Sequence, residues 1–157
     1  MDSENTRIKI CGLRSASAAI VASDAGADYL GFVFVEGVRR QLNVEDGAQI
    51  IADYRTRQKI LNRPGIVGLF RNQDPSFVNK TTRNAGLDYL QLCGDEDDDY
   101  ISKLDAPIFK QVRVVDGTAP TDLNKIVSPL LAVGHGVVLD RFDKETPGGS
   151  GLSFDWA

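Results

Sequence analysis

Short apolar runs recur along the chain and alternate with stretches in which apolar residues have helical spacing. The runs are rich in Val, Ile, Leu, Phe and Tyr, which favour strands. They lie at 7–11, 28–34, 65–70, 88–92, 108–114 and 136–140. Several are continuous instead of alternating, as expected for a parallel sheet covered on both faces. The pattern therefore predicts six buried parallel strands.

Capping residues mark the ends of several helices predicted between these strands. One helix is predicted over 15–25, from the N-cap residue Ser15 to a stop at Gly26, and another over 74–85, from Asp-Pro to Gly86. The other predicted helices are 43–57, 95–104 and 121–131. Connections of this length imply right-handed crossovers between parallel strands.

Two segments of the chain share one pattern, "GADYLGFVF" at 26–34 and "GLDYLQLCG" at 86–94. Each has a helix-ending glycine, a one-residue spacer and then Asp-Tyr-Leu at the start of a strand. The repetition predicts the same helix-to-strand joint in both places, which is typical of a βα unit used many times.

Six βα units fit two architectures. One is an open doubly wound sheet, complete as it stands; the other is an eight-stranded (β/α)8 TIM barrel. The last segment, "TPGGSGLSFDWA" at 146–157, is a glycine-rich loop followed by a helix-capping residue, so the chain ends where a helix is expected to begin. We therefore expect one α/β domain over 1–157, an incomplete TIM barrel with about six βα units.

Composition and charge narrow the function classes. With 157 residues, 42% apolar and 25% charged, the chain has the composition of an ordinary globular protein. A net charge of −4 argues against a broadly basic nucleic-acid surface, and no apolar run approaches the roughly 20 residues that cross a bilayer. Two cysteines and one histidine give no zinc-binding spacing and no disulfide framework. We expect a cytoplasmic protein without metal, nucleic-acid or membrane partners.

Residues that carry chemistry gather at the predicted carboxyl ends of the strands, where the functional edge lies in both architectures. They are Cys11, Arg40, Arg71, Asp95, Glu96, Arg113 and Asp140. A thiol, carboxylates and guanidiniums together suit acid–base chemistry on an anionic substrate. Each of these signals alone also has a purely structural interpretation. Cys11 can be a buried packing residue and Asp140 can cap a turn. The segment "GDEDDDY" can be a solvated helix start, and "GGSG" can be a flexible lid.

In order and in combination, these segments resemble one family, the phosphoribosylanthranilate isomerases of tryptophan biosynthesis. The resemblance runs from 7 to 156 and is carried by "KICGL" at 9–13, "GADYLGFVF" at 26–34, "VGLF" at 67–70, "LQLCGDE" at 90–96, "FKQVRV" at 109–114, "VLD" at 138–140 and "GGSGLSFDW" at 148–156. The pair formed by "KICG" and "GGSG…FDW" is far more specific than any single piece.

The resemblance implies an Amadori rearrangement without cofactor or metal. The family converts N-(5-phosphoribosyl)anthranilate to 1-(2-carboxyphenylamino)-1-deoxyribulose 5-phosphate by general acid–base catalysis, with a small phosphosugar as its partner. By its motif, Cys11 matches the general base and Asp140 the general acid. Arg40 aligns with a loop arginine of the family that holds the anthranilate side of the substrate. Arg39 is the alternative candidate for this position.

Further substrate-binding candidates lie near these residues in the sequence. Lys9 is two residues before Cys11 on the same strand face, where a cation favours the thiolate form. The glycine-rich loop resembles a phosphate cradle, and its candidates are Gly148, Gly149 and Ser150.

The chain also departs from the family pattern. The family usually has histidine at the position of Cys93. It usually has serine–proline–arginine before an aromatic residue, where this chain has "VRRQL" at 38–42. It also has a seventh and an eighth strand, for which this sequence shows no corresponding apolar runs. An open barrel exposes unpaired strand edges, so we expect self-association through these edges and weak or no activity of this chain alone.

Two alternative functions stay open. One is another phosphosugar-handling TIM barrel enzyme, against which the "KICG" start argues. The other is a non-catalytic open-sheet α/β binding domain of the receiver kind, which needs an acidic cluster after its first strand, where this chain has 11–14, "CGLR".

Overall fold

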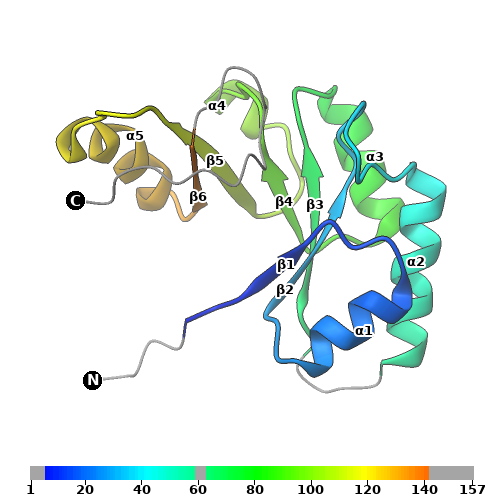
Figure 1. Cartoon of the computed structure of the whole chain (residues 1–157). Coiled ribbons are helices and arrows are strands. Elements are labelled where there is room, and N and C mark those ends of the chain that lie inside the picture. Colours follow the sequence, from blue (N-terminus) through cyan, green and yellow to red (C-terminus); the bar gives the residue numbers. More distant parts are fainter. Residues whose placement is uncertain (1–5, 59–62, 142–157) are drawn as a thin grey trace. The chain divides into compact units, whose positions relative to one another are not determined.

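The apolar runs form strands and the stretches between them form helices in the computed structural model, which describes residues 6–58 and 63–141. The chain divides into two compact units, 1–107 (unit 1) and 108–157 (unit 2). Six strands and five helices alternate in the described residues (Figure 1). All six strands predicted from the sequence are therefore confirmed.

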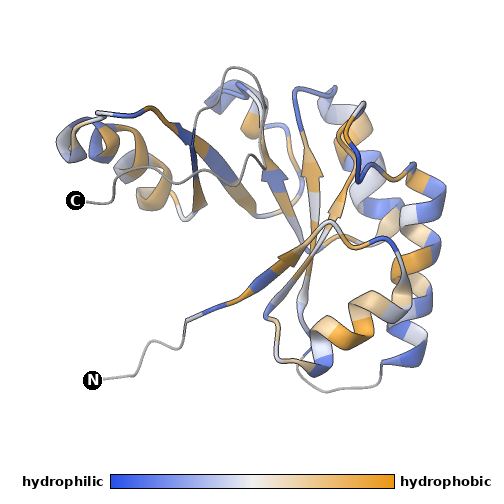
Figure 2. Ribbon diagram, in the orientation of Figure 1, coloured by the Kyte–Doolittle hydropathy of each residue, from blue (hydrophilic) through white to orange (hydrophobic). Residues whose placement is uncertain are grey.

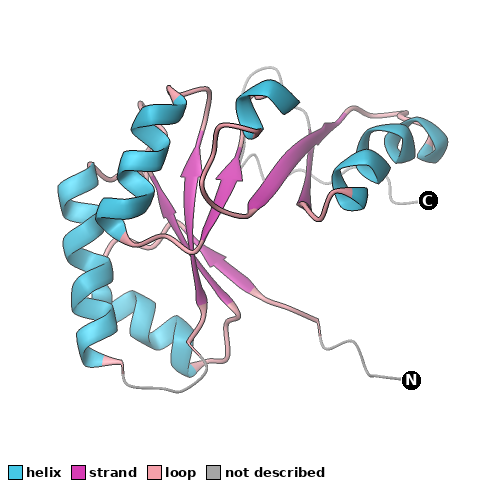
Figure 3. Ribbon diagram, turned by 180° about the vertical axis from the view of Figure 1, so that it is seen from behind, coloured by secondary structure: helices cyan, strands magenta, loops and turns pink. Residues whose placement is uncertain are grey.

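Unit 1 holds four strands and four helices. In chain order they are β1 (Lys9–Cys11), α1 (Ala16–Asp24), β2 (Tyr29–Val33), α2 (Val44–Arg57), β3 (Gly65–Phe70), α3 (Pro75–Ala85), β4 (Tyr89–Leu92) and α4 (Asp98–Ile101). Each strand pairs in parallel with the next one in the sequence. Helices α1, α2 and α3 lie along one face of this sheet (Figure 3).

The core of unit 1 lies between the sheet and these three helices. The strand register places six large apolar side chains on one sheet face, each at most 1% exposed: Leu30, Phe32, Ile66, Phe70, Leu90 and Leu92. Tyr54 and Ile51 of α2 are equally buried. Figure 2 shows the apolar residues concentrated in β3 and on parts of α1 and α2. Burial of this kind stabilises the unit by roughly 25 cal/mol for each Å² of apolar surface removed from water.

The opposite sheet face carries smaller and more polar residues. Cys11 pairs with Gly31, and Lys9 pairs with Tyr29. Because side chains alternate along a strand, Lys9 and Cys11 share this face with Tyr29 and Gly31. Lys9, Cys11 and Tyr29 are only half-buried, so this face is accessible at β1, whereas Val67 of β3 on the same face is fully buried.

The repeated glycine–x–Asp-Tyr-Leu pattern forms the same joint twice. The carboxylate of Asp28 accepts the Ile8 N–H at 2.7 Å, and that of Asp88 accepts the Ile66 N–H at 2.8 Å. In return, the Asp28 N–H donates to the Ile8 carbonyl and the Asp88 N–H to the Ile66 carbonyl, both at 2.8 Å. Each aspartate thus ties the start of its strand to the preceding strand, which confirms the predicted joint.

Unit 2 contains β5 (Ile108–Val114), α5 (Pro120–Ala132) and β6 (Gly136–Arg141). Strands β5 and β6 pair in parallel over six residue pairs, from Phe109 with Gly136 to Val114 with Arg141. The connecting helix begins with Pro120 as its first residue, where the missing N–H of proline costs no helical hydrogen bond. Unit 2 is therefore a β–α–β segment of the predicted kind.

Candidate active site

Cys11 is the last residue of β1, at the carboxyl-terminal edge of the unit 1 sheet, as predicted. Its neighbour in β2 is Gly31, and a Cβ atom added at Gly31 would lie 2.9 Å from the Cys11 Sγ. Gly12 follows with φ +78°, a backbone conformation that glycine adopts without strain. The absence of a side chain at Gly31 thus leaves room for the half-buried Cys11 thiol.

Arg40 lies directly against Cys11 and Gly12, although it follows β2 in the chain. Its Nη1 donates to the Cys11 carbonyl at 3.2 Å, and a Cβ atom at Gly12 would collide with the Arg40 side chain. Arg39 is exposed and makes no hydrogen bond or ion pair with any described residue. The structure thus brings Arg40, and not Arg39, to the main chain of Cys11.

Cys93 has a different environment from Cys11. It follows β4 and is buried, and burial raises the pKa of its thiol to about 11, with Gln91 hydrogen-bonded to the sulfur. The charges of Glu96 and Arg71 and the Cys11 thiol also act on it, so these groups lie near one another. At neutral pH the Cys93 thiol is protonated, which makes it a poor base.

Glu96 joins the loops that follow β3 and β4. Its carboxylate accepts the N–H groups of Asn72 at 2.8 Å and of Gly94 at 2.9 Å, and the side chain is 6% exposed. Asn72 has φ 54° and its Oδ1 accepts the Asp95 N–H at 2.8 Å. The prediction of a solvated helix start is wrong for Glu96, because this residue is buried and its carboxylate accepts hydrogen bonds from backbone N–H groups of two loops.

A second pair of contacts extends this connection to the loop after β2. The Tyr100 hydroxyl donates to the Gln73 carbonyl at 2.6 Å, and the Gln73 Nε2 donates to the Phe34 carbonyl at 2.7 Å. Burial, together with the charge of Glu96, raises the pKa of Tyr100 to about 12, so its hydroxyl stays protonated as a donor. The loops after β2, β3 and β4 are therefore held together at the edge where Cys11 lies.

Replacing Glu96 with alanine is expected to lower the free energy of unfolding by about 2 kcal/mol, because the N–H groups of Asn72 and of the buried Gly94 lose their acceptor. Urea unfolding measures this change. Asp98→Ala is the matched control, since Asp98 is exposed in the next turn and is expected to change stability by less than about 0.5 kcal/mol. Equal effects of the two substitutions would contradict this role of Glu96.

Asp140 lies in β6 of unit 2, next to Arg113 of β5 in the strand register. The Gln111 Nε2 donates to its Oδ2 at 2.7 Å, which fixes the carboxyl group and leaves its second oxygen outside this hydrogen bond. That Asp140 and Cys11 act on the same substrate stays a prediction. Gly148, Gly149 and Ser150 lie outside the described residues.

The described residues contain no group of three or more His, Cys, Asp or Glu side chains placed to hold a metal ion. Over the same residues, every helix is too short or too polar to span a membrane.

Comparison with known proteins gives one consistent result. Residues 8–157 match the family model of N-(5'-phosphoribosyl)anthranilate (PRA) isomerase. Two similar curated proteins are the N-(5'-phosphoribosyl)anthranilate isomerases of Geobacter sulfurreducens, 37% identical, and Trichlorobacter lovleyi, 38% identical. Each alignment covers 96% of this chain, and the chain spans about two thirds of these relatives, 68% and 67% of their lengths.

Solved structures agree with the sequence comparison. The crystal structure of phosphoribosyl anthranilate isomerase from Thermotoga maritima has a TM-score of 0.78 and 27% identity, covering 96% of this chain and 68% of its own. A second isomerase structure, in complex with reduced 1-(o-carboxyphenylamino)-1-deoxyribulose 5-phosphate, has a TM-score of 0.72 and 26% identity, covering 88% of this chain and 66% of its own.

Proposed function

This chain belongs to the N-(5'-phosphoribosyl)anthranilate isomerase family, the isomerases of tryptophan biosynthesis, and we propose that Cys11 and Asp140 carry its acid–base chemistry. The observation that carries the assignment is the family match over residues 8–157. The predicted fold class, an α/β barrel built from βα units, is confirmed by the parallel strands within each unit and by the likeness to solved isomerases. An isomerase assay of the full-length protein tests the function, and absence of conversion above the uncatalysed rate would contradict it.

The reaction starts with protonation of the furanose ring oxygen by the carboxylic acid of Asp140. The bond between C1' and the ring oxygen breaks, which opens the sugar to a protonated Schiff base. The Cys11 thiolate then removes the proton from C2', giving an enolamine. A proton finally moves from the C2' hydroxyl to C1', which leaves the ketone. General acid–base steps of this kind contribute about 10²–10⁴-fold each to the rate.

The surroundings of Cys11 support its role as the base. Lys9 lies two residues earlier on the same face, and Arg40 donates a hydrogen bond to the Cys11 carbonyl. Burial keeps the Cys93 thiol protonated despite the charge of Arg71, so Cys11 is the thiol suited to the reaction.

Arg40 is suited to bind the carboxylate of the anthranilate group, since a guanidinium recognises a carboxylate through two parallel hydrogen bonds. Arg40→Ala is expected to raise KM about tenfold, the effect of losing a charge-assisted hydrogen bond. Steady-state kinetics measure the change. Arg39→Ala is the matched control and is expected to leave KM within about twofold. The reverse pattern would assign the contact to Arg39.

We place the substrate phosphate at Gly148, Gly149 and Ser150, because backbone N–H groups of a glycine-rich loop approach a phosphate closely. The substrate we propose is a small phosphosugar, and the compartment we propose for this protein is the cytoplasm. Two free cysteines, Cys11 and Cys93, agree with a reducing compartment.

We also propose that this chain self-associates through its sheet edge. Strand β1 ends the sheet of unit 1 among the described strands, and Ile8 and Ile10 are 50% and 41% exposed there. Val21 of α1 is also exposed and lines an apolar groove with Ile10. An exposed strand edge with apolar side chains is a template for pairing with another chain.

Sedimentation velocity of the 157-residue chain tests the association. We expect the mean mass to increase with concentration, and Ile10→Lys to reduce it, because a charged side chain on an edge strand opposes pairing. A strictly monomeric chain at all concentrations would contradict the proposal.

A further inference from the structure

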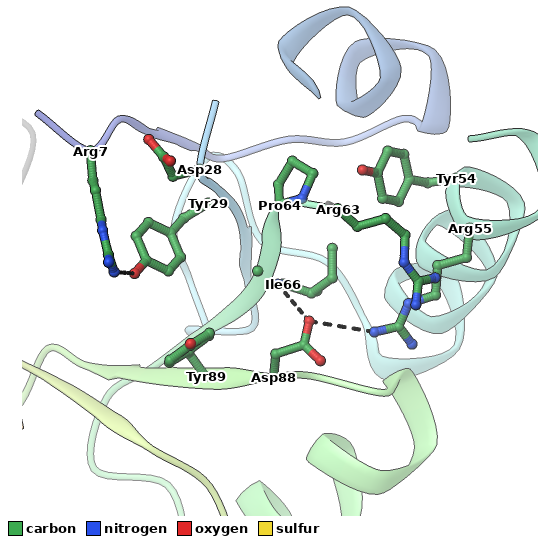
Figure 4. A pocket seen from close by; sticks show the side chains of 11 residues that line it. Arg7, Asp28, Tyr29, Tyr54, Arg55, Arg63, Pro64, Ile66, Asp88 and Tyr89 are labelled. Atoms are coloured by element: carbon green, nitrogen blue, oxygen red, sulfur yellow. Dashed lines mark hydrogen bonds and ion pairs between the residues drawn. The ribbon is translucent and has the colours of Figure 1, made fainter. Parts of the chain in front are cut away.

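A cavity of about 640 Å³ opens at the amino-terminal edge of the unit 1 sheet (Figure 4). It lies where β2, β3 and β4 begin, at the opposite end of the strands from Cys11. Three arginines and two aspartates line it, together with three tyrosines. A cavity of this volume is in the range that accepts a small organic molecule.

Two of the charged side chains in this cavity are occupied by contacts of their own. The Arg7 Nη1 donates to the Tyr29 hydroxyl at 2.9 Å, and the Asp28 carboxylate accepts the Ile8 N–H. These contacts fix the strand starts of β1 and β2. The other charged residues that line the cavity are Arg55, Arg63 and Asp88.

Arg55, from the last turn of α2, is held firmly against the start of β4. Its Nη2 donates to the Gly86 carbonyl at 2.7 Å and lies 3.6 Å from the Asp88 Oδ2. A Cβ atom at Gly86 would collide with its guanidinium, and the side chain is 31% exposed. Both polar contacts use Nη2, so the N–H groups of Nη1 and Nε have no hydrogen-bond acceptor among the described residues.

Arg63 comes just before β3 and extends its guanidinium toward that of Arg55 (Figure 4). It makes no hydrogen bond or ion pair with any described residue. Asp88 is the carboxylate beside the two guanidiniums, and the same Oδ2 also accepts the Ile66 N–H. One carboxylate therefore lies beside two guanidiniums, which leaves a net positive charge at this end of the cavity.

We propose that Arg55 and Arg63 bind the oxyanion group, a carboxylate or a phosphate, of a small molecule in this cavity. Guanidiniums bind both groups through paired N–H donors, and Arg55 is already oriented by Gly86 and Asp88. The rings of Tyr29 and Tyr89 line the same cavity and meet edge to face, with centroids 5.4 Å apart. They offer apolar surface to an aromatic ring carried by the anion. This site goes beyond the isomerase reaction, whose proposed residues lie at the other end of the strands.

The test is a titration of the isotope-labelled chain with inorganic phosphate and, separately, with benzoate, followed by the NMR shifts of the Arg55 and Ile66 amides. We expect a saturable shift of these amides with at least one of the two anions. A shift with phosphate alone would indicate a phosphorylated ligand, and a shift with benzoate would indicate an aromatic carboxylate. Either result supports the site.

Arg63→Gln is expected to weaken this binding about tenfold, the effect of losing one charge-assisted contact. Arg57→Gln is the matched control, because Arg57 lies in the same helix turn as Arg55 but pairs with Asp53 outside the cavity. Neither side chain is buried, so both variants are expected to fold. Absence of a saturable shift with both anions, or equal binding by Arg63→Gln and the parent chain, would overturn the proposal. Neither result depends on isomerase activity.

Discussion

Replacing Cys11 with serine is expected to reduce kcat of the full-length isomerase about 10³-fold, within the range that a general base contributes. Serine keeps the size of the side chain next to Gly31, so the end of β1 is expected to keep its structure. Its hydroxyl does not ionise at neutral pH and cannot remove the C2' proton efficiently. Because binding uses other side chains, KM is expected to change little, so the loss appears in kcat.

Cys93→Ser is the matched control for this substitution. Burial raises the pKa of the Cys93 thiol to about 11, so it is protonated at neutral pH and supplies no base for the substitution to remove. We expect kcat to stay within about threefold of the parent enzyme. If Cys11→Ser keeps near-normal turnover, or Cys93→Ser loses as much, Cys11 is not the base.

Replacing Asp140 with asparagine is expected to reduce kcat by a similar factor, about 10²–10⁴-fold, because an amide cannot donate a proton to the ring oxygen. The asparagine Oδ1 can still accept the Gln111 Nε2–H that Asp140 Oδ2 accepts at 2.7 Å, so the side chain is expected to keep its place in β6. Steady-state kinetics measure the loss, and circular dichroism verifies the fold.

Asp116→Asn is the control for the lost negative charge. Asp116 pairs with Arg141 at 2.6 Å in the same unit, and its side chain is 62% exposed. Exposed ion pairs contribute at most about 1 kcal/mol to stability, so we expect normal turnover from this variant. Turnover of Asp140→Asn close to that of Asp116→Asn would remove Asp140 from the mechanism.

The strands and most helices are predictable because their signals are local. Continuous apolar runs mark the buried strands, and Asp74 with Pro75 marks the start of α3, where the structure has the aspartate as N-cap. The acidic segment predicts a helix over 95–104, but α4 spans only Asp98–Ile101. It begins three residues later than predicted, with Asp97 as its N-cap, because Glu96 is used by the loop contacts.

The candidate site is predictable only in part, because its contacts join distant parts of the chain. Cys11 at the end of a strand follows from the apolar pattern, whereas the contact of Arg40 with its carbonyl requires the loop after β2 to fold back over β1. Glu96 accepting the Asn72 N–H joins residues 24 apart. The neighbouring guanidiniums of Arg55 and Arg63 likewise depend on how α2 packs beside β3, which no local pattern encodes.

The most direct test of the catalytic pair is a crystal structure of the full-length protein with reduced 1-(o-carboxyphenylamino)-1-deoxyribulose 5-phosphate bound. We expect the Cys11 Sγ within about 4 Å of the ligand carbon that corresponds to C2', and the Asp140 carboxyl within hydrogen-bond reach, about 3 Å, of the oxygen derived from the ring. A ligand that contacts only one of these two side chains, or neither, would contradict the account.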